Sequence, residues 1–396
     1  TTPVCRNAPP TPFPQPVWAA ESVVGGPRLA ADGLVVDLPP GTPAPPRVPD
    51  VSYVLADMGT GEVLAAKAPH AWLRPASTLK TLTALTLIPR LDPRRVVVAK
   101  PEHEAANGTR VGILAGNRYP VGRLFDALLM SSANDAAYLL AEAAGGFEQT
   151  AILMNETARK LGAHDTVAVD PSGLDEEGQR SSAYDLALIG RAAMQLPDFR
   201  AYVTRRTAVF PGGKAASTGK VYRPFQIQNI NDLLPNYPGA IGIKPGRTNR
   251  AQHTFIGAAT RDGRTLIVTQ MGSTTGDWKN TAALLNWGFA HADAVVPVGR
   301  LVEPGEAEPP SPAPTTSRTT TPAASAGSAG DVGPARPSRP ADGTGGVAAD
   351  GLVGEGTAAT VATGGIAILV LGLVAVSATF LVRRRRHRPA ATDSPQ

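Results

Sequence analysis

The spacing of apolar residues along the chain predicts strands at both ends of a folded region and helices between them. Apolar runs at 51–56 and 62–66, separated by a turn-forming stretch at 58–61, are typical of two paired strands. Apolar positions three residues apart then predict a helix over 77–88, which Pro89 ends.

The middle of the chain keeps a helical repeat, and the region after it returns to strands. Further helices are expected at 121–130, 135–144, 149–161 and 184–194. Ser182 and Asp185 match a capping box at the start of the last of these. Strands follow at 240–244, 253–260 and 265–271, with a hairpin turn at 261–264, and then a helix at 278–290. The first and last strands predict one sheet with helices on its faces, an α/β (α+β) fold.

Both ends of the chain depart from this pattern. The first 50 residues contain 13 prolines and no sustained periodicity, which predicts an extended arm laid over the folded domain. At 298–356 the chain is mostly Pro, Ala, Gly, Ser and Thr, and it cannot bury enough apolar surface to offset the entropy of ordering. The sequence therefore predicts an arm (1–50), a folded domain (51–297) and a disordered stalk (298–356).

A charge-free run of 22 residues follows the stalk, at 361–382. As an α-helix it would be about 33 Å long, enough to cross a hydrocarbon core of about 30 Å. Five arginines follow at 383–388, and basic flanks stay on the cytoplasmic side. We therefore expect a transmembrane helix (357–382), a cytoplasmic tail (383–396), and a catalytic domain anchored outside the plasma membrane with the lipid bilayer as a partner. A buried core helix is the alternative.

The net charge of +5 raises the question of nucleic-acid binding, but its distribution argues against that class. Outside the tail, 33 basic residues stand against 32 acidic ones, so the rest of the chain is nearly neutral. Cys5 is the single cysteine, which excludes a disulfide within the chain. We expect neither a metal ion nor a cofactor.

Ser77 and Lys80 form the first candidate for chemistry, in the sequence Pro75-Ala76-Ser77-Thr78-Leu79-Lys80. Residues three apart at a helix start lie on one face and within reach of each other. A serine hydroxyl is a weak nucleophile until a base takes its proton, and a lysine amine whose pKa is lowered towards neutrality is such a base. The alternative is that Ser77 only caps the helix.

Two further stretches have polar side chains at the ends of expected elements. Ser132 and Asn134 stand two apart between two helices, so both side chains can enter one cleft. The alternative for Asn134 is capping of the helix that begins beside it. Lys244 and Gly246 end a strand and can present a cation and backbone N–H groups to an anionic substrate. The alternative for them is an ordinary strand end.

The order S-x-x-K, S-x-N, K-x-G resembles that of the penicillin-recognising serine D-Ala-D-Ala carboxypeptidases, which have a β-lactamase-like fold. The resemblance covers about 51–290. Flanking segments follow in the order of the family: Asp57, Thr60-Gly61 and Val63-Leu64, then 128–137, Met154-Asn155, Leu161-Gly162, 171–175 and 182–186.

The resemblance implies a five-stranded antiparallel sheet between helical layers. It implies that Ser77 is acylated and that Lys80 is its base. Ser132 would relay protons, Asn134 would bind the substrate amide, and Lys244 would assist proton transfer and anion binding. The backbone N–H groups of Ser77 and Arg247 would form the oxyanion hole. The implied substrate is the D-Ala-D-Ala end of a peptidoglycan stem peptide, with β-lactam antibiotics as further ligands.

Pro245 departs from the family pattern, because the third motif usually has a hydroxyl residue there that contacts the terminal carboxylate. Gly246, Arg247, Thr248 and Lys279 are the candidates for binding this carboxylate instead. Two other functions stay open at this stage. A β-lactamase is one, although no Glu-x-x-Leu-Asn segment follows the second motif. A catalytically impaired module that binds the cell wall or a partner is the other.

Overall fold

The structure is a computed structural model, and it describes residues 13–313. The expected transmembrane helix (357–382), the tail (383–396), Cys5 and most of the expected stalk lie outside the described residues. Within 13–313, none of the helices has the length and the apolar character needed to cross a membrane.

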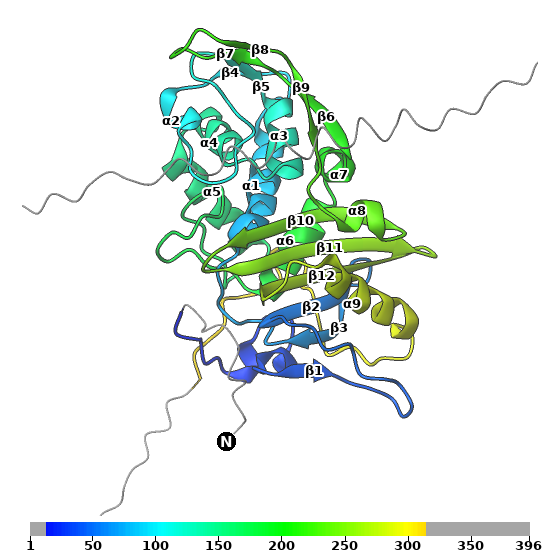
Figure 1. Ribbon diagram of the computed structural model, residues 1–396. Helices are drawn as coiled ribbons and strands as arrows, with labels where there is room; N and C mark the ends of the chain where they lie inside the picture. The colour runs from blue at the N-terminus through cyan, green and yellow to red at the C-terminus, as the bar shows by residue number, and fades with distance from the viewer. Residues whose placement is uncertain (1–12, 314–396) are drawn as a thin grey trace, which may run out of the picture. The chain divides into compact units, whose positions relative to one another are not determined.

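A seven-stranded antiparallel sheet forms one layer of the domain, in the order β1-β3-β2-β12-β11-β10 with β13 also paired to β3 (Figure 1). Its strands are β1 (Leu34–Val36), β2 (Ser52–Asp57), β3 (Glu62–Lys67), β10 (Ala240–Thr248), β11 (Gln252–Arg261), β12 (Arg264–Ser273) and β13 (Gly299–Arg300). The expected pairing of early with late strands is confirmed, since Val54 of β2 lies opposite Thr269 of β12. The expected number of five strands is wrong, because the arm adds β1 and the segment after 297 adds β13.

Helices cover both faces of this sheet. The α-helices are α1 (Lys80–Leu87), α2 (Pro101–Glu104), α3 (Val121–Met130), α4 (Asn134–Ala143), α5 (Phe147–Lys160), α6 (Ala183–Ala193), α7 (Pro197–Thr204), α8 (Leu233–Asn236) and α9 (Trp278–His291). On one face, Leu285 of α9 shares a buried cluster with Leu55 and Val268. On the other, Leu82 of α1 and Ile189 of α6 belong to the larger core. Ser182 caps α6 as expected, because its hydroxyl accepts the N–H of Asp185 at 3.1 Å.

Short elements complete the described chain. The 3-10 helices are η1 (Ala20–Ser22), η2 (Pro27–Ala30), η3 (Ala76–Leu79) and η4 (Ile88–Arg90). Three strand pairs, absent from the sequence-based expectations, are β4 (Val96–Val98) with β5 (Arg118–Pro120), β6 (Thr207–Phe210) with β9 (Phe225–Gln228), and β7 (Gly213–Lys214) with β8 (Val221–Tyr222). They lie at the end of the helical region away from the sheet (Figure 1).

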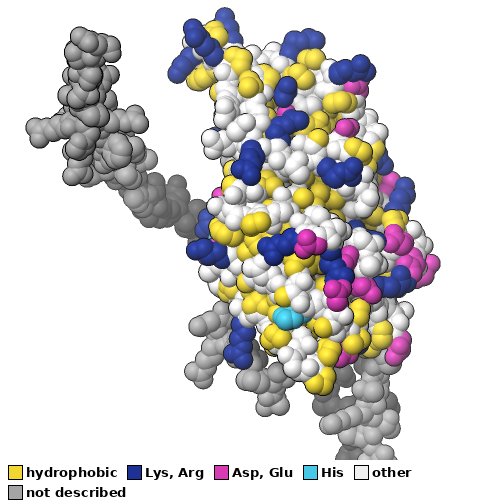
Figure 2. Space-filling model, turned by 90° about the vertical axis from the view of Figure 1, so that its right-hand side faces the viewer, with side chains coloured by type: hydrophobic (Ala, Val, Ile, Leu, Met, Phe, Trp, Pro, Cys, Tyr) yellow, Lys and Arg dark blue, Asp and Glu magenta, His cyan; other side chains and the backbone are white. Residues whose placement is uncertain are grey.

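This end of the domain is cationic. Residues 205–231 contain five basic residues and no acidic one. Figure 2 shows several Lys and Arg side chains at the top of the molecule, and most of the Asp and Glu side chains on this face lower down. The segment ends beside the second motif in space, because the N–H of Ile230 donates to the carbonyl of Met130 at 2.9 Å. The last residues of this segment therefore lie beside Met130, two positions before Ser132.

The domain extends beyond both of its expected boundaries. In the arm, Leu29 is fully buried and β1 joins the sheet. After 297, Leu301 and Val302 are buried, and the N–H of Ala313 still bonds to the carbonyl of Val17 at 2.9 Å. The structure thus differs from the expected stalk start at 298. The reason is a short apolar stretch, interrupted by proline, whose burial depends on contacts with the arm.

Candidate active site

Ser77 and Lys80 lie where η3 passes into α1. The Nζ atom of Lys80 is 2.9 Å from the hydroxyl of Ser77, as their spacing predicts. Ala76, just before Ser77, has a φ of 48°, a left-handed conformation that costs a residue with a Cβ atom free energy. The surrounding packing therefore holds the backbone on which Ser77 is presented.

Three oxygen atoms surround the Lys80 amine. Besides Ser77 Oγ, they are Asn134 Oδ1 at 2.7 Å and the carbonyl of Ser172 at 2.5 Å. The Asn134 amide nitrogen in turn donates to the carbonyl of Asn107 at 2.7 Å. Asn134 makes no side-chain cap, since it is the first residue of α4 and follows the N-cap Ala133. The capping alternative is therefore wrong, and the first and second motifs meet at Lys80.

Burial controls the charge of the two lysines. Lys80 is fully buried, and burial lowers its pKa to about 7, while the charges of Asp170 and Asp135 act in the opposite direction. Lys244 is also fully buried. Its pKa lies well below the usual value because of burial and, second, because of the charge of Lys80. Burial is therefore the largest cause of the lowered pKa of both lysines.

Ser132 and Lys244 occupy buried positions with constrained surroundings. Ser132 has a φ of 60° between α3 and α4 and is 5% exposed. The Nζ atom of Lys244 donates to the carbonyl of Pro245 at 2.8 Å. Pro245 lies on β10, the edge strand of the sheet, where a residue without an N–H group is tolerated. The structure gives both residues the burial that a proton-transfer site needs, while their roles remain predictions.

Gly246 brings β10 against the nucleophile. A Cβ atom at this position would lie 2.8 Å from the amide nitrogen of Ser77, closer than real side chains come. Opposite Gly246, Thr254 of β11 donates its hydroxyl to the carbonyl of Pro75 at 2.8 Å. Strands β10 and β11 are thus fastened to the turn that presents Ser77.

The other three candidates for carboxylate binding are placed differently. Thr248 donates its one hydroxyl proton to Asp175 at 2.7 Å, so it cannot donate it to a substrate carboxylate in this arrangement. Arg247 is exposed on β10, opposite His253, whose pKa is lowered by burial and by the Arg247 charge. Lys279 is exposed in the first turn of α9. The neighbouring helix residues line a pocket behind Pro245, and Lys279 is not among its lining residues.

Sequence reasoning missed the loop that supplies the third partner of Lys80. One carboxylate oxygen of Asp170 accepts the N–H groups of Ser172 at 2.7 Å and of Gly173 at 2.9 Å. Thr83 of α1 donates its hydroxyl to the carbonyl of Pro171 at 2.7 Å. Residues 171–175 belong to a flanking segment of the family resemblance, but a backbone carbonyl is common to every residue and carries no sequence signal.

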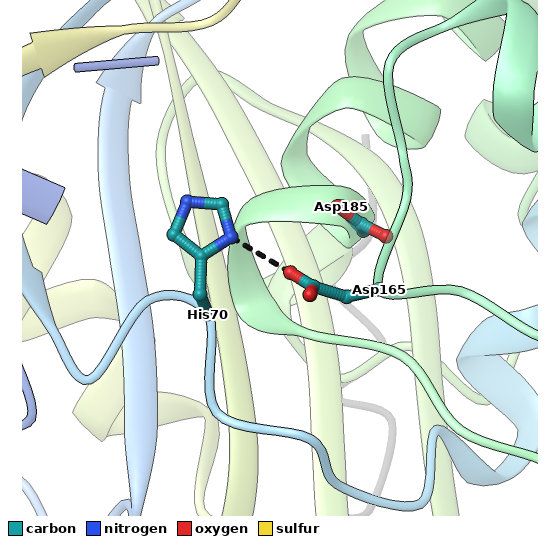
Figure 3. Close-up of side chains that lie close together, drawn as sticks. All are labelled: His70, Asp165 and Asp185. Carbon is teal, nitrogen blue, oxygen red and sulfur yellow. Dashed lines mark hydrogen bonds and ion pairs between the residues drawn. The ribbon is translucent and has the colours of Figure 1, made fainter. Parts of the chain in front are cut away.

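A second polar cluster lies at the attachment of the arm (Figure 3). His70 bonds through Nδ1 to Asp165 at 2.7 Å and through Nε2 to the carbonyl of Val24 at 3.0 Å. Ligand atoms of His70, Asp165 and Asp185 lie within 4.8 Å of one another. Two ligands of one tetrahedral zinc ion stand about 3.3 Å apart, so the 2.7 Å contact is that of a direct hydrogen bond. The cluster fastens the arm to the domain.

The sheet between helical layers and the hydrogen bond between Ser77 and fully buried Lys80 are the features of a serine hydrolase. Residues 40–275 match the family model described as D-alanyl-D-alanine carboxypeptidase. The curated D-alanyl-D-alanine carboxypeptidase DacB2 of Mycobacterium tuberculosis is 39% identical over 259 residues, which cover 64% of this chain and 86% of the relative. The chain therefore belongs to the D-alanyl-D-alanine carboxypeptidase family.

Solved structures agree with this assignment. A crystal structure of D-alanyl-D-alanine carboxypeptidase from Mycobacterium tuberculosis superposes with a TM-score of 0.62 at 39% identity, over 67% of this chain and 99% of that one. The DD-transpeptidase of Streptomyces K15 superposes with a TM-score of 0.59 at 28% identity, over 63% of this chain and 100% of the other. These similarities support a serine-type DD-carboxypeptidase and favour neither the β-lactamase nor the impaired module.

Proposed function

We propose that this carboxypeptidase removes the terminal D-alanine of peptidoglycan stem peptides through an ester formed on Ser77. The observation that carries the proposal is the position of the fully buried Lys80 amine, 2.9 Å from the hydroxyl of half-buried Ser77. A lysine whose pKa is about 7 is neutral for much of the time at neutral pH. It can therefore take the proton of Ser77 as the hydroxyl attacks.

The reaction proceeds by two acyl transfers. Ser77 Oγ attacks the carbonyl carbon of the penultimate D-alanine while Lys80 takes its proton, and the oxyanion is held by the N–H groups of Ser77 and Arg247. The C–N bond then breaks, and a proton passed through Ser132 leaves with the amine of the terminal D-alanine. Water hydrolyses the ester and restores the Ser77 hydroxyl. Asn134 holds the substrate amide, and Lys244 assists at the anionic end.

Labelling with a fluorescent penicillin tests this proposal. A β-lactam acylates the same serine and leaves a stable adduct when deacylation is slow. We expect one adduct per chain on the wild type and none on Ser77→Ala, with the labelled peptide identified by mass spectrometry. Rapid turnover of the penicillin without a lasting adduct would indicate a β-lactamase. An adduct on a residue other than Ser77 would refute the assignment of the nucleophile.

We also propose that the segment at 357–382 anchors the domain on the outer side of the plasma membrane. The support is the charge-free run of 22 residues followed by five arginines. Protease added to intact spheroplasts should cut the chain between 314 and 356 and leave the last dozen residues protected. Digestion of the tail with protection of the domain would reverse the orientation.

A further inference from the structure

The partners of Lys80 differ in what they can do. Asn134 Oδ1 and the carbonyl oxygen of Ser172 can only accept hydrogen bonds, whereas the Ser77 hydroxyl can accept or donate. The bond from Asn134 Nδ2 to the Asn107 carbonyl fixes which end of the amide faces Lys80. A neutral amine has two N–H donors and one lone pair. With the donors directed at Asn134 and Ser172, the lone pair faces Ser77.

The Ser172 carbonyl is held in place by Asp170. One oxygen of this carboxylate accepts the N–H groups of Ser172 at 2.7 Å, Gly173 at 2.9 Å and Leu174 at 3.4 Å, and the Ser172 hydroxyl also donates to it. Gly173 has a φ of 84° and passes against the carbonyl of Ala76, where a Cβ atom would have no room. The turn therefore fixes the carbonyl that accepts a hydrogen bond from Lys80.

Charged groups face Lys80 from three elements. Asp170 belongs to the loop before α6, Asp135 to α4 and Lys244 to β10. Tyr138 of α4 lies beside Asp170, and burial with the Asp170 charge raises its pKa, so it stays neutral at ordinary pH. Asp135 accepts the N–H groups of Val111, Gly112 and Ile113. Of the two carboxylates, Asp170 is therefore the one that also builds the turn carrying a Lys80 partner.

We propose that Asp170 is a positioning residue for acylation: its turn directs the lone pair of Lys80 at Ser77, and its negative charge stabilises the protonated form of Lys80. The inference rests on the proposed function, in which Lys80 is the base. Asp170 thus makes two separate contributions: its oxygen holds the turn, and its charge acts on Lys80. An asparagine at position 170 keeps an oxygen for the turn and removes the charge, whereas an alanine removes both.

The test is the rate of penicillin acylation as a function of pH for the wild type, Asp170→Asn and Asp170→Ala. In the wild type the rate should rise with pH as Lys80 loses its proton (the acid limb) and then reach a constant value (the plateau). We expect Asp170→Asn to move the acid limb to lower pH by about one unit, because the charge that stabilises protonated Lys80 is lost. The plateau rate of this variant should stay within about threefold of the wild-type rate. We expect Asp170→Ala to lower the plateau at least about thirtyfold, because the lone pair is no longer directed. Recovery of the plateau by asparagine distinguishes positioning from a general loss of structure.

Asp175→Asn is the matched control, because it removes a charge from the same loop at a carboxylate that faces Thr248. Its acid limb should coincide with that of the wild type. An unshifted limb in Asp170→Asn, or an unchanged plateau in Asp170→Ala, would overturn the inference. Should Asp170→Ala fail to fold, the pH at which the acylation rate of Asp170→Asn rises is the deciding measurement. Failure of the proposed function looks different, since the wild type would then form no adduct on Ser77.

Discussion

The backbone of Gly246 on β10 lies against the amide nitrogen of Ser77, with space for a hydrogen atom but not for a methyl group. A Cβ atom there would meet Thr254 Oγ1 at 2.5 Å, Ser77 N at 2.8 Å and Thr78 N at 2.9 Å. Two of these three atoms belong to the backbone and cannot rotate away. The close approach places the end of β10 beside the N–H group proposed for the oxyanion hole.

Gly246→Ala should therefore separate β10 from Ser77 and lower the rate of penicillin acylation by about a hundredfold, the effect typical of losing one oxyanion donor. The melting temperature should fall by only a few degrees, since the change lies at a sheet edge. Gly33→Ala is the control, because a Cβ atom at position 33 would meet nothing within 4 Å. Equal acylation rates for the two variants would exclude the close approach as a determinant of activity.

The pKa of Lys80 sets the expected pH dependence of acylation. Burial lowers this pKa from 10.5 to about 7, and only the neutral amine can act as the base. The acylation rate should therefore rise tenfold per pH unit below about 7 and level off above it. Stability should change in the same direction: the unfolded chain binds this proton more tightly, so the cost of burying Lys80 diminishes as pH rises from about 7 to 10.5.

Lys80→Arg should abolish acylation at every accessible pH, because a guanidinium does not lose its proton there. Stopped-flow measurement with a chromogenic cephalosporin from pH 5 to pH 9 would show both the wild-type limb and its absence in the variant. A wild-type profile without a limb near 7, or a variant that acylates at the normal rate, would mean that another group is the base.

Arg247 and Lys279 offer a matched test of carboxylate recognition. Arg247 is the exposed cation on β10 next to Gly246, whereas Lys279 faces solvent on α9. Arg247→Ala should lower kcat/KM for a D-Ala-D-Ala peptide about tenfold more than for its C-terminally amidated analogue. Lys279→Ala should change both values less than about twofold. A selective loss in Lys279→Ala instead would show that α9 rather than β10 binds the carboxylate.

The segment after 297 should contribute to stability. Glu303 pairs with Arg191 at 2.8 Å, the N–H of Gly305 bonds to the carbonyl of Lys160 at 2.8 Å, and Ser311 bonds to the arm. A chain ending after 313 should fold and acylate like the full protein. A chain ending after 302 should melt several degrees lower, at a few degrees per kcal/mol of lost free energy. Identical melting curves would place the domain boundary before Glu303 after all.

The cluster in Figure 3 makes a further prediction about stability. The contacts of His70 and Trp72 hold the pKa of Asp165 below its usual range despite burial, whereas burial and the Asp165 charge raise that of Asp185. Asp165→Asn removes a buried carboxylate from its contact with half-buried His70 and should cost about 3 kcal/mol in urea unfolding. Asp185→Asn removes the carboxylate whose ionisation is disfavoured and should cost less than 1 kcal/mol. The reverse order would contradict this distribution of charge.

Sequence alone determined what depends on local geometry. Ser77 and Lys80 stand three residues apart at a helix start, and that spacing brings the two side chains together in any helix. Apolar runs predicted five of the seven strands, and the helical repeat predicted the helices on both faces, because burial selects apolar residues in each element. The resemblance then supplied Asn134 and Lys244, whose local patterns left capping and a strand end open.

Tertiary structure decided what depends on contacts between distant segments. The Ser172 carbonyl reaches Lys80 across 92 positions of sequence, and Thr254 reaches Pro75 across 179. A carbonyl is common to every residue, so no residue type marks the one that serves. Strands β1 and β13 have two to three residues each, and both pair with β3. Lys279 shows the same limit: its place in the sequence is close to the final strand, but the rotation of α9 turns it towards solvent.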